Sequence, residues 1–275
     1  MLALISCAKT MASVSKIDCP AGTVPLFENR ASEIAFHMSQ FPVDELGQLL
    51  RVNTKLAIEN YKRFQVFHAD DAPSLPALLA YTGIVFKRLN PSGFTERDML
   101  YAQEHLRITS FCYGLLRPLD RIKNYRLEGD VRLPELGDKT LFDFWKPILT
   151  DLFIKEVKKH GGVLVYLASN EMKSLFDWKK VESEVKVVTP EFHLEKAGKL
   201  KTVVVYTKMA RGEMTRFLLK ERLTDVERLK EFSWEGFAFR PELSDPANYI
   251  FTNSERCAES NFLARKCGFD TRSSI

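Results

Sequence analysis

The sequence lacks a long apolar run and a cysteine framework. Its clearest apolar run covers residues 163–168, far short of the roughly 20 residues that a membrane-spanning helix needs. A secretory signal has a basic segment followed by an apolar one. The first residues have no basic segment, and their apolar stretch is interrupted by Lys9, so they do not resemble such a signal. The five cysteines are widely spaced without a Cys-x-x-Cys pair, which argues against disulfides and a zinc site. We therefore expect a cytoplasmic protein with no membrane contact.

Metal and cofactor motifs are missing as well. The five histidines are scattered and form no His-x-His or His-Glu-x-x-His pattern, so we expect no metal. Without any Glu-x-x-His pair, an iron-storage bundle is disfavoured. The sequence also has no Gly-x-x-x-x-Gly-Lys-Ser/Thr loop and no Gly-x-Gly-x-x-Gly fingerprint, which removes the usual support for nucleotide and dinucleotide folds. We accordingly predict no cofactor.

The composition indicates a globular protein. With 13 glycines and 12 prolines among 275 residues, collagen-like and low-complexity classes are excluded, and 45% apolar residues are enough for a buried core. We find no repeat and no linker, so residues 1–253 are predicted to form one domain and residues 254–275 a loose polar tail. The net charge of +4 permits nucleic-acid binding without requiring it.

The hydrophobic pattern predicts a mixed α/β fold. Residues 2–5 and 163–168 are apolar runs typical of buried strands, and residues 84–86 are a further strand candidate. Residues 184–189 and 200–206 are predicted to form a hairpin, and residues 208–223 a helix.

The predicted helix at 208–223 carries cations beside its apolar stripe. Lys208 and Arg211 share one face and Arg216 lies at its edge, an arrangement that suits phosphate because guanidinium donors match its oxygens in pairs. Gly212 inside a helix costs roughly 0.5–1 kcal/mol against alanine, so we expect another backbone to approach there. A solvated charged face is the alternative interpretation.

A second basic region covers residues 107–132, where cations outnumber acids. Arg107, Arg117 and Arg126 are interleaved with tyrosines, including Tyr113, and such segments bind phosphates and stack on bases. The alternative is a loop tied by internal ion pairs, such as Arg117 with Asp120. Both interpretations stay open.

Two polar loops follow the apolar strands. Ser6, Lys9 and Thr10 come after the first, while Asn170 and Glu171 come after the run at 163–168. Ligands of α/β folds bind beyond the carboxyl ends of strands, so we expect these loops and the basic helix to meet in space. Plain structural roles are the alternative, including Ser169 as the cap of a helix.

Several ordered blocks resemble the YaaA family of peroxide-stress-resistance proteins. The resemblance runs from residue 1 to about 253, with Cys7, Ile84 and Met172 departing from the family's usual proline, aspartate and tyrosine. Its blocks are Ser-Cys-Ala-Lys-Thr at 6–10, Gln-Glu-His-Leu-Arg at 103–107, Tyr-Gly-Leu-Leu-Arg-Pro-Leu-Asp at 113–120, Tyr-Arg-Leu-Glu at 125–128, Leu-Ala-Ser-Asn-Glu at 167–171, Tyr-Thr-Lys-Met-Ala-Arg-Gly-Glu-Met-Thr-Arg-Phe at 206–217 and Glu-Gly-Phe-Ala-Phe at 235–239.

The resemblance implies a cytoplasmic protein that protects against hydrogen peroxide, with lower free iron and less oxidative DNA damage. It also implies a mixed sheet surrounded by helices, a helix-hairpin-helix element and a basic cleft that binds double- and single-stranded DNA.

Two functions remain open. A DNA-binding stress protein would contact the phosphate backbone with little sequence preference. An enzyme acting on a small phosphorylated or anionic ligand would gather Ser6, Lys9, Glu171, Lys208 and Arg211 around one pocket, together with Asn170. A wide groove favours the first function and a narrow pocket the second.

Overall fold

The computed structural model describes residues 1–134, 137–196 and 198–254, so the predicted tail beyond Ser254 lies outside the described residues. An eight-stranded mixed sheet runs through them in the order β11-β12-β9-β8-β1-β3-β4, with β10 paired to β9. The strands are β1 (Leu2–Ile5), β3 (Leu106–Ser110), β4 (Gly114–Leu116), β8 (Val163–Tyr166), β9 (Lys186–Lys196), β10 (Lys199–Lys201), β11 (Ala238–Phe239) and β12 (Asn248–Ser254).

The inner strands of the sheet are parallel, and the strands at its margins are antiparallel. β12, β9, β8, β1 and β3 pair in parallel, whereas β4, β10 and β11 pair in the opposite sense. Every residue of β1 is fully buried. A central parallel strand of this kind is covered on both faces, which explains its uninterrupted apolar sequence. The predicted single-domain mixed α/β fold is confirmed.

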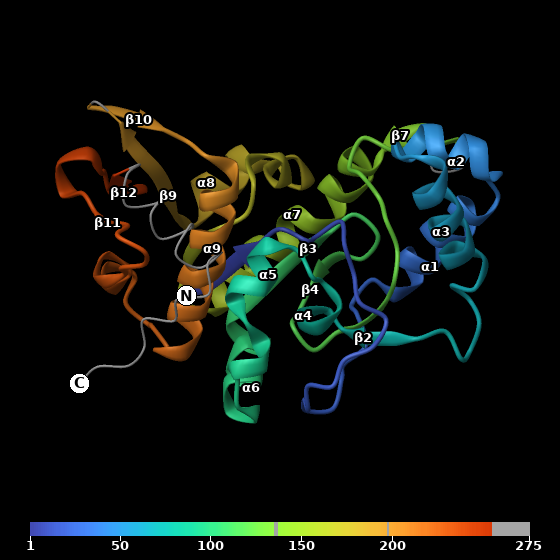
Figure 1. Ribbon diagram of the computed structural model, residues 1–275, viewed down its shortest axis with the longest axis horizontal. Helices are drawn as coiled ribbons and strands as arrows, with labels where there is room; N and C mark the ends of the chain where they lie inside the picture. The colour runs from blue at the N-terminus through green and yellow to red at the C-terminus, as the bar shows by residue number, and fades with distance from the viewer. Residues whose placement is uncertain (135–136, 197, 255–275) are drawn as a thin grey trace, which may run out of the picture.

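Helices surround the sheet. In Figure 1, three of them (α1 to α3) gather at one end, whereas β9 to β12 and α9 lie at the other. The α-helices are α1 (Glu28–Ser39), α2 (Val43–Leu50), α3 (Thr54–Gln65), α4 (Ala77–Ala80), α5 (Ile84–Leu89), α6 (Glu96–His105), α7 (Leu141–Lys159), α8 (Trp178–Glu184) and α9 (Val204–Lys220).

Short elements complete the described chain. Two small antiparallel pairs lie outside the main sheet, β2 (Ser74–Pro76) with β5 (Arg121–Lys123) and β6 (Arg132–Leu133) with β7 (Lys139–Thr140). The 3-10 turns are η1 (Pro91–Gly93), η3 (Asn170–Leu175), η4 (Val226–Glu231) and η5 (Pro241–Leu243). None of the helices in the described part combines the length and apolar character that crossing a membrane requires.

The packing of α9 against α5 positions the candidate site. Ala210, Met214 and Leu218 form the fully buried stripe of α9. A Cβ placed on Gly212 would lie 2.3 Å from the Val85 carbonyl oxygen of α5. The expected close approach of another backbone is therefore found, and it explains a glycine in the middle of a helix.

Several sequence-based element boundaries were wrong. Residues 84–86 form the start of α5 and not a strand, because an apolar run of three fits a buried helix equally well. The predicted strand 200–206 ends at Lys201, and α9 begins at Val204, one turn before the expected start at Lys208. The helix-hairpin-helix element and the basic cleft stay predictions.

Candidate functional site

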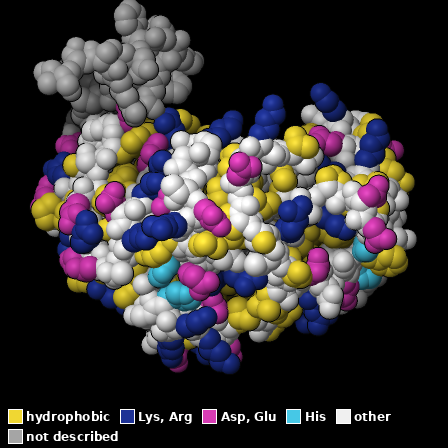
Figure 2. Space-filling view, turned by 90° about the horizontal axis from the view of Figure 1, so that it is seen from below, with side chains coloured by type: hydrophobic (Ala, Val, Ile, Leu, Met, Phe, Trp, Pro, Cys, Tyr) yellow, Lys and Arg dark blue, Asp and Glu magenta, His cyan; other side chains and the backbone are white. Residues whose placement is uncertain are grey.

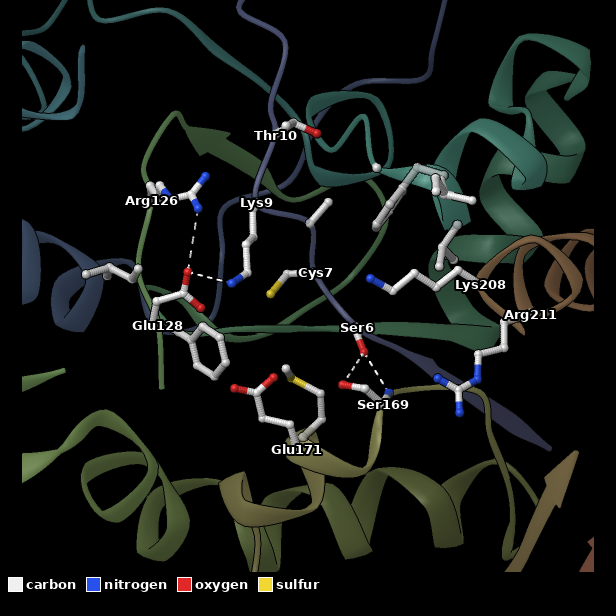
Figure 3. A pocket seen from close by; sticks show the side chains of 18 of the residues that line it. Ser6, Cys7, Lys9, Thr10, Arg126, Glu128, Ser169, Glu171, Lys208 and Arg211 are labelled. Carbon is white, nitrogen blue, oxygen red and sulfur yellow. Dashed lines mark hydrogen bonds and ion pairs between the residues drawn. The ribbon is translucent and has the colours of Figure 1, made fainter. Parts of the chain in front are cut away.

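A cavity of about 370 Å³ lies beyond the carboxyl ends of β1 and β8. Its walls come from the loop after β1, the loop after β8, residues 125–128 and the facing sides of α5 and α9. Figure 3 shows the side chains of Ser6, Lys9, Glu171, Lys208 and Arg211 around it. The two polar loops and the basic helix thus meet in space, as their sequence predicts.

Hydrogen bonds between the two strand-end loops fix the floor of this cavity. The Ser6 hydroxyl donates to Ser169 Oγ at 3.3 Å, and the Ser169 backbone N–H donates to Ser6 Oγ at 2.8 Å. The Leu167 N–H also donates to the Leu4 carbonyl at 2.9 Å, which continues the parallel pairing beyond β8. Ser169 takes the N-cap position of η3, as the structural alternative expects, but its side chain makes no capping hydrogen bond.

One side of the cavity holds two carboxylates. Glu128 pairs with Lys9 at 2.8 Å and lies 3.8 Å from the Arg126 guanidinium. The Glu171 carboxylate accepts no hydrogen bond from any described residue. Desolvation raises the pKa of Glu171, the charge of Glu128 raises it further, and Lys9 opposes this rise. Lys9 therefore pairs with a carboxylate, whereas the Ser6 hydroxyl donates to Ser169.

The opposite side holds two cations from α9. Within the described ranges, neither the Lys208 ammonium nor the Arg211 guanidinium donates a hydrogen bond. The Arg211 Nε is buried without a partner, and the Arg126 Nε across the cavity is in the same situation. Burial lowers the pKa of Arg211. A buried donor without an acceptor costs about 1–3 kcal/mol. The Lys208, Arg211 and Arg126 side chains line the cavity, so an anion bound there can accept hydrogen bonds from their accessible donors.

Three other predicted cations use their donors inside the protein. Arg107 is 4% exposed and donates to Glu156 at 2.6 Å and to the carbonyls of Gln103, Glu104 and Leu106. Arg117 donates to Asp120 at 2.8 Å, which is the internal pair that its spacing also allowed. Arg216 donates to two carbonyl oxygens at the end of α5.

The remaining predicted pocket residues divide between the cavity and other places. Thr10 lines the cavity, and its hydroxyl accepts a hydrogen bond from Thr82 at 3.1 Å. Tyr113 is buried outside the lining, where its hydroxyl accepts from the Lys123 N–H at 3.0 Å. Asn170 opens η3 with its side chain exposed and is outside the lining as well.

Sequence reasoning missed part of the wall. Glu128 contributes a carboxylate, and the start of α5 brings Gly83 and Val85 to the cavity. A Cβ on Gly83 would lie 2.7 Å from the Ala8 Cβ, so the glycine lets α5 approach the loop after β1. The one signal available was the position of Glu128 two residues after Arg126, which places both side chains on the same side of an extended segment.

Positive and negative side chains are mixed on one face of the molecule. Figure 2 shows Lys and Arg interspersed with Asp and Glu over the face it draws. Among the described residues, no group of three His, Cys, Asp or Glu side chains is placed to hold a metal.

Comparison with known proteins identifies relatives along nearly the whole chain. A family model described as "Peroxide stress protein YaaA" matches residues 1–243. A UPF0246 protein of Bacteroides thetaiotaomicron is 66% identical over 253 residues, covering 92% of this chain and 98% of the relative. Another from Bacteroides fragilis is 64% identical over 255 residues, with 93% and 99% coverage. A more distant one from Legionella pneumophila is 36% identical over 255 residues, with 91% and 98% coverage. The names of these relatives state no ligand or activity.

Proposed function

The chain belongs to the YaaA family of peroxide stress proteins, and from this premise we propose that it binds the phosphate backbone of DNA through Lys208 and Arg211. The partner would be double- or single-stranded DNA, with little sequence preference, in the cytoplasm. Limiting iron-driven DNA damage is the second part of the proposal, and it rests on the family resemblance.

One observation carries the binding proposal. Arg211 and Lys208 line the cavity, and neither side chain donates a hydrogen bond or forms an ion pair within the described residues. Phosphate oxygens satisfy donors of this kind in charge-assisted hydrogen bonds. Contacts to phosphate carry no base information, which accounts for the expected lack of sequence preference.

A salt series tests the proposal. Fluorescence anisotropy of a labelled duplex and a labelled single strand would be measured between about 50 and 200 mM salt. Each phosphate contact contributes roughly 0.9 to the slope of log affinity against log salt for a duplex and about 0.7 for a single strand. Arg211→Ala should lower this slope by about one contact and weaken binding equally for all sequences.

Arg117→Ala is the matched control because its guanidinium is engaged with Asp120. It should leave the slope and the affinity unchanged. If Arg211→Ala behaves like this control while the wild type binds DNA, the phosphate site lies elsewhere and this proposal fails.

A second candidate function is an enzyme acting on a small phosphorylated or anionic ligand. The cavity volume of about 370 Å³ favours it, since this lies in the range of small-molecule sites and far below the space a duplex occupies. Wild-type protein that binds inorganic phosphate but shows no salt-sensitive DNA binding would support the enzyme over the DNA-binding function.

A further inference from the structure

We propose that the cavity holds a single nucleotide, with its phosphate on Lys208 and Arg211 and the amino-bearing edge of its base on Glu128 and Glu171. The inference rests on the proposed function in one respect, namely that Lys208 and Arg211 form a phosphate site. It adds the class of ligand, which is a nucleotide whose base carries an exocyclic amine.

The cavity has two ends of opposite charge. In Figure 3, Lys208 and Arg211 reach in from α9, whereas Glu128 and Glu171 lie across from them, with Ser6 and Ser169 between the two groups. A simple phosphate would use only the cationic end. The ligand that uses both ends has an anion at one end and hydrogen-bond donors at the other.

The acidic end is built to accept hydrogen bonds. Glu128 lies between Lys9 at 2.8 Å and Arg126 at 3.8 Å, and these two contacts orient its carboxylate. Glu171, in contrast, has no hydrogen-bond donor among the described residues and points into the cavity in Figure 3. Carboxylates accept from the N4 amine of cytosine, and adenine presents an N6 amine of the same kind, whereas thymine has no exocyclic amine.

Apolar side chains also line the cavity and suit the faces of a base. They include Ile84 and Phe86 of α5, Phe111 after β3 and Met172 of η3. Bases pack on apolar and aromatic side chains through their flat faces. The volume of about 370 Å³ accommodates one nucleotide but no base pair. A nucleotide from DNA would therefore enter unstacked, from a single strand, a gap or an extruded position.

Free nucleotides and nucleotides of a DNA strand share this chemistry, and two arms of the experiment separate them. In the first arm, calorimetry measures the binding of dCMP, dAMP, dTMP and inorganic phosphate to the full chain. We expect dCMP and dAMP to bind about 5- to 10-fold more tightly than dTMP, and Glu171→Gln to reduce this preference to about twofold.

Glu45→Gln is the matched control, because Glu45 is an exposed glutamate of α2 at the far end of the molecule. It should keep the full preference for dCMP over dTMP. In the second arm, a single strand carrying 2-aminopurine reports unstacking through increased fluorescence. An increase in wild type that is lost in Arg211→Ala supports entry from a strand, whereas nucleotide binding without any increase supports the free nucleotide.

Two results would overturn the inference. One is equal affinity for the three nucleotides, and the other is a preference that Glu171→Gln leaves intact. If either occurs while Arg211→Ala still lowers the salt slope of DNA binding, the proposed DNA function stands alone. If nucleotides bind with the expected preference but DNA shows no salt-sensitive binding, the nucleotide site stands and the proposed DNA function falls.

Discussion

The central block at residues 107–132 and the cavity differ in how their arginines use their donors, and Arg126 belongs to both. In the central block at residues 107–132, the guanidinium groups of Arg107 and Arg117 donate hydrogen bonds to backbone carbonyls and to nearby carboxylates. At the cavity, Arg211 and Arg126 each have a buried Nε without a partner, and Lys208 has no ion pair within the described ranges. The comparison shows that the number of cations in a segment does not tell how many of their donors are already engaged within the protein.

The difference follows from where each segment lies in the fold. Arg107 belongs to β3, an inner strand of the sheet, so its charge must be satisfied within the protein. Arg211 lies on the side of α9 that faces the open end of the sheet, where the loops after β1 and β8 leave a cavity. A charged side chain at this edge of the sheet, such as that of Arg211, is able to contact a ligand in the cavity.

The largest expected effect is the loss of Arg107. Arg107→Met keeps much of the side-chain volume but leaves three carbonyl groups and the half-buried Glu156 without their donor. Since unsatisfied buried groups cost about 1–3 kcal/mol and broken buried pairs cost more, we expect a loss of about 2–4 kcal/mol in the free energy of unfolding. Urea denaturation measures it.

Arg117→Met is the comparison variant for that measurement, because the Arg117 side chain is 39% exposed and the buried Asp120 keeps hydrogen bonds from Thr23 and the residue 117 backbone N–H, so the loss should be smaller, about 1–2 kcal/mol. The contrast between the two regions would be refuted if Arg107→Met kept full stability and instead lost affinity for DNA.

The second effect concerns the contact that holds α9 at the cavity. Gly212→Ala would place a Cβ 2.3 Å from the Val85 carbonyl oxygen and 2.7 Å from the Arg88 Cβ, so α5 and α9 must separate. Overpacking of this kind costs about 1–3 kcal/mol. Because Val85 also lines the cavity, ligand affinity should fall with stability. Thermal unfolding and phosphate binding, measured on the same variant, check both expectations.

The control for this variant is Gly47→Ala in α2, where the nearest atom is the Ala57 Cβ at 3.3 Å. Alanine is favoured over glycine inside a helix by roughly 1 kcal/mol, so this change should be neutral or stabilising. If the Gly212→Ala variant were as stable as the Gly47→Ala variant, the close contact between α5 and α9 would not contribute to the stability of the fold.

The sequence predicts the cavity better than it predicts the individual cations. Polar loops after apolar strands must meet at one edge of a parallel sheet, so Ser6, Lys9 and Glu171 were placed together from spacing alone. Which donors are already occupied depends on partners far along the chain, such as Glu156 for Arg107, 49 residues away. Helical spacing says nothing about these partners. The run at residues 84–86 was assigned to a strand because three apolar residues show no periodicity.

A third, smaller effect links the far end of α9 to pH. Burial raises the pKa of Asp98, but the hydrogen bonds from Lys220 and Thr95 outweigh it and lower that pKa to about 2. The folded-state pKa thus lies below the unfolded value of about 3.9. Asp98 therefore stabilises the protein above about pH 4, and this contribution is lost as the pH falls towards about 2.

Asp98→Asn should lower the free energy of unfolding by about 1 kcal/mol at neutral pH, because the cap of α6 and the ion pair to α9 both weaken. The difference from wild type should shrink between about pH 4 and pH 2. Denaturation at a series of pH values measures it, and a difference that stays constant across that window would contradict the assignment.

The smallest effect compares one thiol from each region. Burial, followed by the charges of Glu171 and Glu128, raises the pKa of Cys7 at the cavity to about 12. In the central block, burial also raises the pKa of Cys112. A protonated thiol is a poor nucleophile, so neither residue should react quickly with iodoacetamide or hydrogen peroxide near pH 7.5. Cys19, which is exposed, provides the reference in the same molecule.

Peptide mapping after timed alkylation should therefore show Cys7 and Cys112 modified at least about 10-fold more slowly than Cys19. Cys257 and Cys267 lie outside the described residues and are followed on their own peptides. Rapid modification of Cys7 alone would mean that the cavity supplies a thiolate despite its two carboxylates. The cavity would then be able to carry out thiol chemistry, and Cys7 and Cys112 would differ in reactivity.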